Sequence, residues 1–331
     1  MSHLVETMAY AGETPWHGLG KEVPADLSPE QMLVAAGLDW TVEKIPAFAT
    51  VNGKRVNVGH SALVRSSDQT ILDVVTNDWN PVQNSEAFDF FNEFVHAGDM
   101  EMHTAGSLRD GQIVWALAKV KDSFTVFKDD KVDAYLLFTN PHRFGQSIDI
   151  RFTPIRVVCN NTITLALNQH AKRVVKASHR TEFDPHAAKT ALGIAHHKLG
   201  QYKEMAVFLG SKPFNERTLK DYFKEVFPVA SIKKNEPEII QATSGNVEVA
   251  IKKEVREMSR NAETALSVID SQPGAEFAKG SWWQAFNTVT FMVDHKLGRT
   301  DETRLNSAWF GQGNRVKVNA LEKAVEYAKA A

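Results

Sequence analysis

Two hydrophobic periods follow each other along the chain, and the change between them limits the folds that it can adopt. Up to about residue 180 the pattern is mixed α+β and includes alternating strands such as Gln146–Phe152, where Ile148, Ile150 and Phe152 share one face. After Asp184 apolar residues recur at three- and four-residue steps, which is the period of an amphipathic helix. The chain is therefore predicted to be α+β, with an antiparallel β-sheet core and packed helices, followed by a mostly helical C-terminal region.

Several strands and helices have clear boundary signals. Asn52-Gly53, between two extended runs at 40–50 and 55–65, predicts a β-hairpin, and Ser28-Pro29 followed by Gly37 predicts a short helix. Pro154 is expected to interrupt the strand that contains Ile150. Further strands are expected at 71–76, 113–120, 132–139 and 155–159, and helices at 85–96, 188–209, 251–269, 282–293 and 316–329.

One polar segment divides the chain. Residues 229–245 contain Lys233, Lys234, Pro237 and Gly245, a composition typical of a linker. This predicts an α+β core domain at 1–228, a linker at 229–245 and a helical C-terminal region at 246–331.

The net charge of −2 conceals a strong asymmetry. Residues 1–150 hold 11 Lys and Arg against 21 Asp and Glu, a net charge of −10, whereas residues 151–331 hold 27 against 19, a net charge of +8. Such a division indicates a polyanionic partner for the basic half. It also favours head-to-tail contact between subunits, although the two parts can equally complement each other within a monomer.

The positive charge is most concentrated between Arg143 and Arg180, where Asp149 is the only acid. Cations for phosphates and a planar group for bases are what a single-strand groove needs, and Phe144 supplies the planar group. His142, His170 and His179 are expected to add charge near pH 6. An ordinary solvated surface is the alternative. The predicted nucleic-acid-binding residues are Arg143, Phe144, Arg151, Arg156, Lys172, Arg173, Lys176 and Arg180.

The sequence contains no recognisable catalytic motif. The two Gly-x-Gly pairs at 18–20 and 311–313 lack the third glycine of a dinucleotide loop, and no phosphate-loop lysine pattern exists. His186, His196 and His197 do not have the spacing of metal ligands on one helix face. Cys159 at a strand end is either a nucleophile or, as single cysteines usually are, a buried small hydrophobe. We therefore predict a non-enzymatic protein without metal or cofactor.

Composition also indicates the compartment. A single cysteine cannot build a disulfide framework, and the N-terminus lacks a signal-peptide pattern. No apolar run reaches the ~18 residues of a membrane span. The expected location is the cytoplasm, with no membrane partner.

Two segments resemble a known family. Tyr10–Gly20 (YAGETPWHGLG) is similar to the opening of the phage/plasmid-like proteins grouped as DUF932, a family of unknown function, and Phe152–Thr162 (FTPIRVVCNNT) is similar to its central motif. The resemblance implies a phage, prophage or plasmid gene whose product works in the bacterial host cytoplasm.

By a looser analogy of architecture, the chain resembles the phage single-strand annealing proteins Redβ, Erf and RecT. That analogy implies ATP-independent binding and annealing of single-stranded DNA in recombination, by a homo-oligomeric ring or filament. The alternative is a mobile-element protein that binds a host replication or recombination protein and modulates it. Its motivating features are the helical stripes and the C-terminal aromatic residues Trp282, Trp283, Trp309 and Phe310, which core packing also explains.

Overall fold

The structure of the protein is a computed structural model. It describes residues 5–12, 19–127, 130–156, 161–162, 175–180, 184, 200–229, 257–298 and 300–331. Lys172, Arg173 and Cys159 lie outside the described residues, as do the three histidines at 186, 196 and 197.

The centre of the fold is a large sheet whose neighbouring strands are antiparallel, except for one parallel pair at its edge. Its strands are β1 (Val5–Ala11), β2 (Lys21–Val23), β6 (Met100–Leu108), β7 (Ile113–Thr125), β8 (Lys131–Pro141), β9 (Ile148–Arg156), β10 (Asn161–Thr162) and β11 (Val175–Ala177). The spatial order is β10-β9-β8-β7-β6-β1-β2, and β11 also pairs with β9. The parallel pair is β1 and β2.

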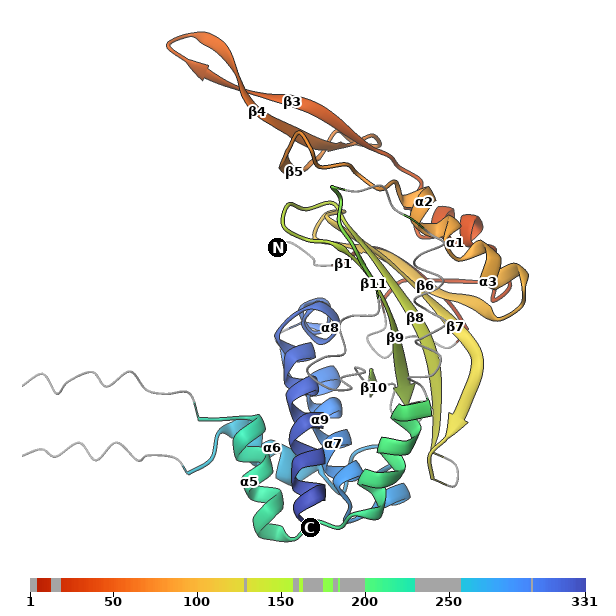
Figure 1. Cartoon of the computed structure of the whole chain (residues 1–331), viewed down its shortest axis with the longest axis vertical. Coiled ribbons are helices and arrows are strands. Elements are labelled where there is room, and N and C mark those ends of the chain that lie inside the picture. The colour runs from red at the N-terminus through yellow and green to blue at the C-terminus, as the bar shows by residue number, and fades with distance from the viewer. Residues whose placement is uncertain are drawn as a thin grey trace, which may run out of the picture.

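Helices cover both faces of this sheet (Figure 1). Three short helices, α1 (Pro29–Ala35), α2 (Asn84–Asp89) and α3 (Asn92–His96), pack on one face. The other face is covered by the helix at 200–211 together with α5 (Glu216–Val226), α6 (Arg260–Val268), α7 (Trp282–Phe291), α8 (Asp301–Phe310) and α9 (Gln312–Ala330). Strand alternation divides the two cores. Trp115 and Leu117 of β7 face the C-terminal helices, whereas Val114 and Ala116 face α1–α3.

A second, three-stranded sheet extends away from this body (Figure 1). It contains β3 (Val42–Val51), β4 (Lys54–Arg65) and β5 (Ile71–Thr76) in the order β3-β4-β5. The turn between β3 and β4 is Asn52-Gly53, and both residues have positive φ (50° and 75°), which is the conformation that a two-residue hairpin turn requires. The predicted hairpin is thus confirmed.

The predicted fold class is confirmed as well, since antiparallel sheets dominate the N-terminal part and helices the C-terminal part. The predicted α1 helix is present, with Ser28 as its N-cap in a capping box with Gln31. The domain division stays a prediction. α5 and α6, which lie on either side of the predicted linker, belong to one hydrophobic core.

Two local predictions were wrong. The helix expected at 85–96 is broken into α2 and α3 around Phe90 and Phe91, whose rings are fully buried against the sheet and pack near Phe138. Pro154 does not interrupt its strand, because β9 continues to Arg156. On the outer side of β9, β11 pairs with 148–150 and β10 with 155–156, so Pro154 lies where neither strand needs its missing N–H.

A buried ion pair joins two helical elements of the C-terminal region. α7 continues into a π-helical turn, Met292–Lys296, that carries Asp294. The Asp294 carboxylate accepts a hydrogen bond of 3.0 Å from Lys317 Nζ of α9, and both side chains are fully buried. Burial lowers the pKa of Lys317, and the adjacent Asp294 opposes that shift. Removing one partner leaves a charge in the core without its counter-ion.

We expect Lys317→Met to lower the free energy of unfolding by about 3–5 kcal/mol. Lys317→Met combined with Asp294→Leu should recover most of that loss, because no buried charge then remains from the pair. Urea denaturation followed by circular dichroism measures both values. A double variant no more stable than the single one would contradict this role of the pair.

Candidate nucleic-acid interface

The predicted binding residues that the structure describes lie on four segments. Arg143 and Phe144 lie in the loop between β8 and β9, and Arg180 lies in the turn after β11. Arg151 and Arg156 lie on β9, and Lys176 lies on β11, opposite Asp149 of β9. The described members of the predicted set thus come from separate segments of the sheet and its loops.

The loop after β8 and the turn after β11 meet at the end of β5. The backbone N–H of Asn80 donates to the carbonyl of His179 at 2.7 Å, and the His179 ring stacks on Trp79 with centroids 4.1 Å apart. One residue beyond β8, His142 is held by Asn84 through a 3.0 Å hydrogen bond between its Nε2 and the amide Oδ1. Segments that are distant in the sequence thus form one junction, which places Arg143, Phe144 and Arg180 in the same region.

Two buried histidines lie beneath this surface. Burial lowers the pKa of His142 to about 3, helped by repulsion from His179. Burial also lowers the pKa of His179 to about 4, against hydrogen bonding with the backbone of Asn80 and Pro141. The expectation that these two histidines add charge near pH 6 was wrong, because a buried imidazole loses the solvation that stabilises its protonated form. His170 lies outside the described residues.

Phe144 is presented to solvent on a fixed backbone. Its side chain is 52% exposed, and its backbone N–H donates to the carboxylate of Asp73 on β5 at 2.8 Å. Gly145 follows with φ of +75°, so the loop turns away directly after the exposed ring. An exposed aromatic side chain on an anchored loop has the geometry of a stacking platform.

Two arginines belong to the same junction. Arg143 precedes it and is half-buried. Arg180 makes one 3.2 Å ion pair with Asp78, and both side chains are largely exposed, at 63% and 59%. An exposed pair of this kind contributes little to stability, so the guanidinium can exchange its partner for a phosphate at small cost.

Arg151 has a different setting. Its Nη2 donates to the backbone carbonyl of Trp309 at 3.0 Å, and its Nε lies 3.4 Å from Asp149. Strand alternation places it on the face that α8 covers, opposite Ile150. Arg151 therefore links the sheet to the C-terminal helices, and we do not include it in the exposed surface.

The sequence interpretation missed the support that the junction receives from residues 77–84. Trp79 and Asn84 are buried and hold the two histidines, but nothing in their spacing links them to residues 142 and 179. The available signal was indirect. His142 follows a strand end at Asn140-Pro141, and polar residues at such ends often reach neighbouring loops.

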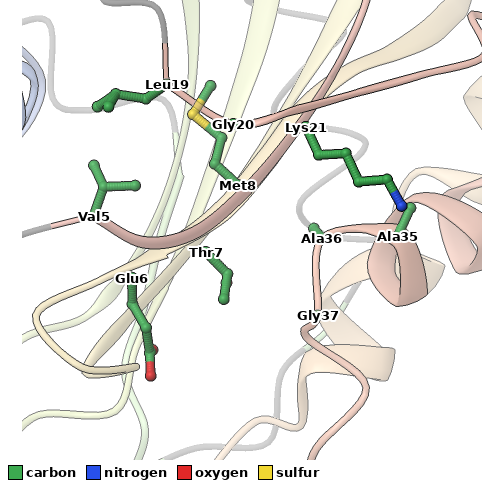
Figure 2. A pocket seen from close by; sticks show the side chains of 10 residues that line it. All are labelled: Val5, Glu6, Thr7, Met8, Leu19, Gly20, Lys21, Ala35, Ala36 and Gly37. Atoms are coloured by element: carbon green, nitrogen blue, oxygen red, sulfur yellow. The ribbon is translucent and has the colours of Figure 1, made fainter.

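A shallow cleft lies elsewhere, between β1, the start of β2 and the end of α1 (Figure 2). It has a volume of about 540 Å³, and Val5, Met8 and Leu19 give it an apolar side. Glu6 points away from Lys21 (Figure 2) and is held by Arg65 at 2.7 Å. The cleft thus brings no reactive side chains together.

Comparison with known protein families identifies the family of this chain. The chain matches the family model described as "Domain of unknown function (DUF932)" over residues 71–309, which is more than half of its 331 residues. The chain belongs to the DUF932 family. The matched range contains the motif at 152–162, whereas the motif at 10–20 lies before it. Neither the curated proteins nor the solved structures gave a match.

Neither a membrane-spanning helix nor a metal site is found in the part of this DUF932 chain that the structure describes. None of the helices in that part is both long and apolar enough to span a membrane. The same residues contain no group of three or more His, Cys, Asp or Glu side chains arranged to hold a metal ion.

The buried histidines make a pH dependence testable. An unfolded histidine binds a proton near pH 6.5, whereas His142 and His179 do so only near pH 3 and pH 4. The free energy of unfolding should therefore be greatest above about pH 6.5 and fall as the pH decreases toward about 4, by up to about 1.4 kcal/mol per pH unit for each histidine.

Urea denaturation between about pH 7 and about pH 5 measures this slope. His142→Gln with His179→Gln should reduce the slope, and the remainder should come partly from His103, whose pKa burial also lowers to about 4. His60→Gln, at an exposed position on β4, is the matched control and should leave the slope unchanged. An unchanged slope in the double variant would show that the two histidines are not held neutral by the fold.

Proposed function

We propose that this DUF932 protein binds single-stranded nucleic acid, with DNA favoured, at the surface formed by Arg143, Phe144 and Arg180. The observation that carries the proposal is an exposed aromatic ring on an anchored loop, at a junction that also carries Arg143 and Arg180 and is held from beneath by buried, hydrogen-bonded histidines. Such a surface can stack one base while it neutralises neighbouring phosphates.

Lys176 extends this surface in the sequence, four residues before Arg180 on β11. Arg156, Lys172 and Arg173 remain predicted contributors, and the last two lie outside the described residues. The whole stretch from Arg143 to Arg180 has seven cations and one acid, so a nucleic acid held at Phe144 has further positive charge available along the chain.

The biological role that we propose is ATP-independent binding and annealing of single strands in the recombination or replication of a mobile element, within the bacterial host cytoplasm. The absence of a phosphate-loop motif in the sequence agrees with a reaction that consumes no nucleotide. Annealing requires several strands to be held together, so self-assembly into a ring or filament is part of the proposal.

The second candidate, an interaction module for a host protein, loses three of the aromatic residues that motivated it. Trp282 and Trp283 are 1% exposed and Trp309 is 7% exposed, and all three pack in the core beneath the sheet. These tryptophans are structural, so a host partner would need another surface.

Binding of a fluorescent single-stranded oligonucleotide, measured by anisotropy at several salt concentrations, tests the proposal. Arg143→Ala and Arg180→Ala should each weaken binding and reduce the slope of log K against log salt by about 0.7, because each removes one phosphate contact. Phe144→Ala should cost about 1–3 kcal/mol of binding free energy with the salt slope unchanged, since stacking releases no counter-ion.

Two variants serve as controls. Phe144→Trp should retain binding, because indole also stacks on bases. Arg217→Ala, at an exposed position on α5, should leave binding unchanged. If Arg143→Ala, Phe144→Ala and Arg180→Ala all bound the oligonucleotide with wild-type affinity, the proposed binding surface would be wrong.

A further inference from the structure

Among the described strands, none pairs with the distal part of the β3–β4 hairpin, residues 47–59, apart from the two strands of the hairpin itself. β5 pairs with β4 only from His60 to Val64, so beyond that point the hairpin is a two-stranded ribbon. We call residues 47–59 the arm. It projects away from the large sheet and from both helical layers (Figure 1). Isolated two-stranded ribbons are marginally stable in water, so a ribbon of this kind gains from contact with another surface.

One face of the arm is apolar and exposed. Residues 54, 56 and 58 alternate onto the same face of β4, and the register Val51↔Lys54 adds Val51 to it. Val51, Val56 and Val58 are 53%, 47% and 45% exposed. On the opposite face the Arg55 guanidinium lies 3.8 Å from the centre of the Phe48 ring. An apolar strand face with adjacent cations is typical of a protein-binding surface.

The arm is also a basic island in an acidic half. It contains Lys54 and Arg55 and no Asp or Glu, whereas residues 1–150 as a whole have a net charge of −10. From Ser66 to Leu108 the chain has eight Asp and Glu and no Lys or Arg. An acidic surface that is complementary in charge to the arm is therefore available on the chain itself.

Three of those eight acids lie on α2 and α3, and a further acid lies on α1. Glu86 and Asp89 of α2 and Glu93 of α3 are exposed, and Glu30 is exposed on α1, which packs on α2. Val34 of α1 is 55% exposed, so this acidic surface also contains an exposed apolar side chain. We call the outer side of α1–α3 the acidic face.

The arm cannot reach the acidic face of its own chain. Figure 1 shows the tip of the hairpin at the far end of the three-stranded sheet from α1–α3. The two surfaces can meet only between different molecules. Nucleic acid is a poorer occupant of the arm, because valines form its exposed apolar face and the Arg55 guanidinium lies 3.8 Å from the centre of the Phe48 ring, where a base would stack.

We propose that the arm of one copy docks on the acidic face of a second copy. The contact is heterologous, since two different surfaces meet, and repeated contacts of this type give a closed ring or an open filament. The inference supplies the surfaces for the self-assembly that the proposed function includes, but it is tested without nucleic acid, so either can fail alone.

Charge reversal on each surface tests the two sides of the proposed contact separately. Lys54→Glu with Arg55→Glu on the arm, and Glu86→Lys with Glu93→Lys on the acidic face, should each weaken self-association of the full chain by about tenfold or more. Sedimentation velocity over a range of concentrations measures this. An equimolar mixture of the two variants should associate again, because the reversed arm then meets the reversed face.

Two matched variants complete the design. Val56→Ser on the arm should weaken association, whereas Val207→Ser, at a similarly exposed position (42%) on the helix at 200–211, should not. Circular dichroism confirms that each variant is folded. A wild-type protein that sediments as a monomer at every concentration would overturn the proposal, as would a mixture of the reversed variants that does not associate.

Discussion

The strands at the centre of the sheet are buried on both faces, and the rest of the structure depends on that constraint. On β8 every residue from Val132 to Pro141 is buried, and β7 sends large side chains to one side and small ones to the other. Trp115 meets Trp309 of α8 edge to face, with ring centroids 5.0 Å apart, whereas Ala116 and Ala118 leave room for the phenylalanines of α2 and α3. Most of the sheet is therefore unavailable for binding.

Binding groups must then lie at the ends of strands or on segments that project from the large sheet and its helices. The junction after β8 is one such place, where polar contacts to buried His142 and His179 hold a short loop that exposes Phe144. The arm is the other. We propose that the first surface contacts nucleic acid and the second a copy of the same chain, so that the two kinds of binding use separate regions.

Local signals in the sequence were sufficient for some elements and insufficient for others. Asn52-Gly53 and the Ser28 cap predicted the hairpin and α1, because turn and cap chemistry is set by adjacent residues. β6, which was not predicted, contains Glu101, His103 and Gly106 and is a strand because it lies between β1 and β7. That placement depends on distant segments, which a periodicity argument cannot detect.

The candidate site was predictable only as a region. Charge counting directed attention to residues 143–180, but it treated Arg151 and Arg180 alike. Alternation on β9 turns Arg151 toward α8, where it binds the Trp309 carbonyl, and the turn after β11 leaves Arg180 in solvent. The burial of His142 likewise depends on Asn84 and Trp40, which are distant in sequence. Which cations remain exposed follows from the helical layers, and the sequence alone does not reveal where those layers lie.

The most direct test of the account is a photocrosslink between the wild-type protein and a single-stranded oligonucleotide that carries iodouracil, with the attached peptide mapped by mass spectrometry. The account predicts that the principal crosslink is at Phe144 in the loop between β8 and β9. Efficient crosslinking confined to the arm, or to another surface remote from that loop, would contradict it.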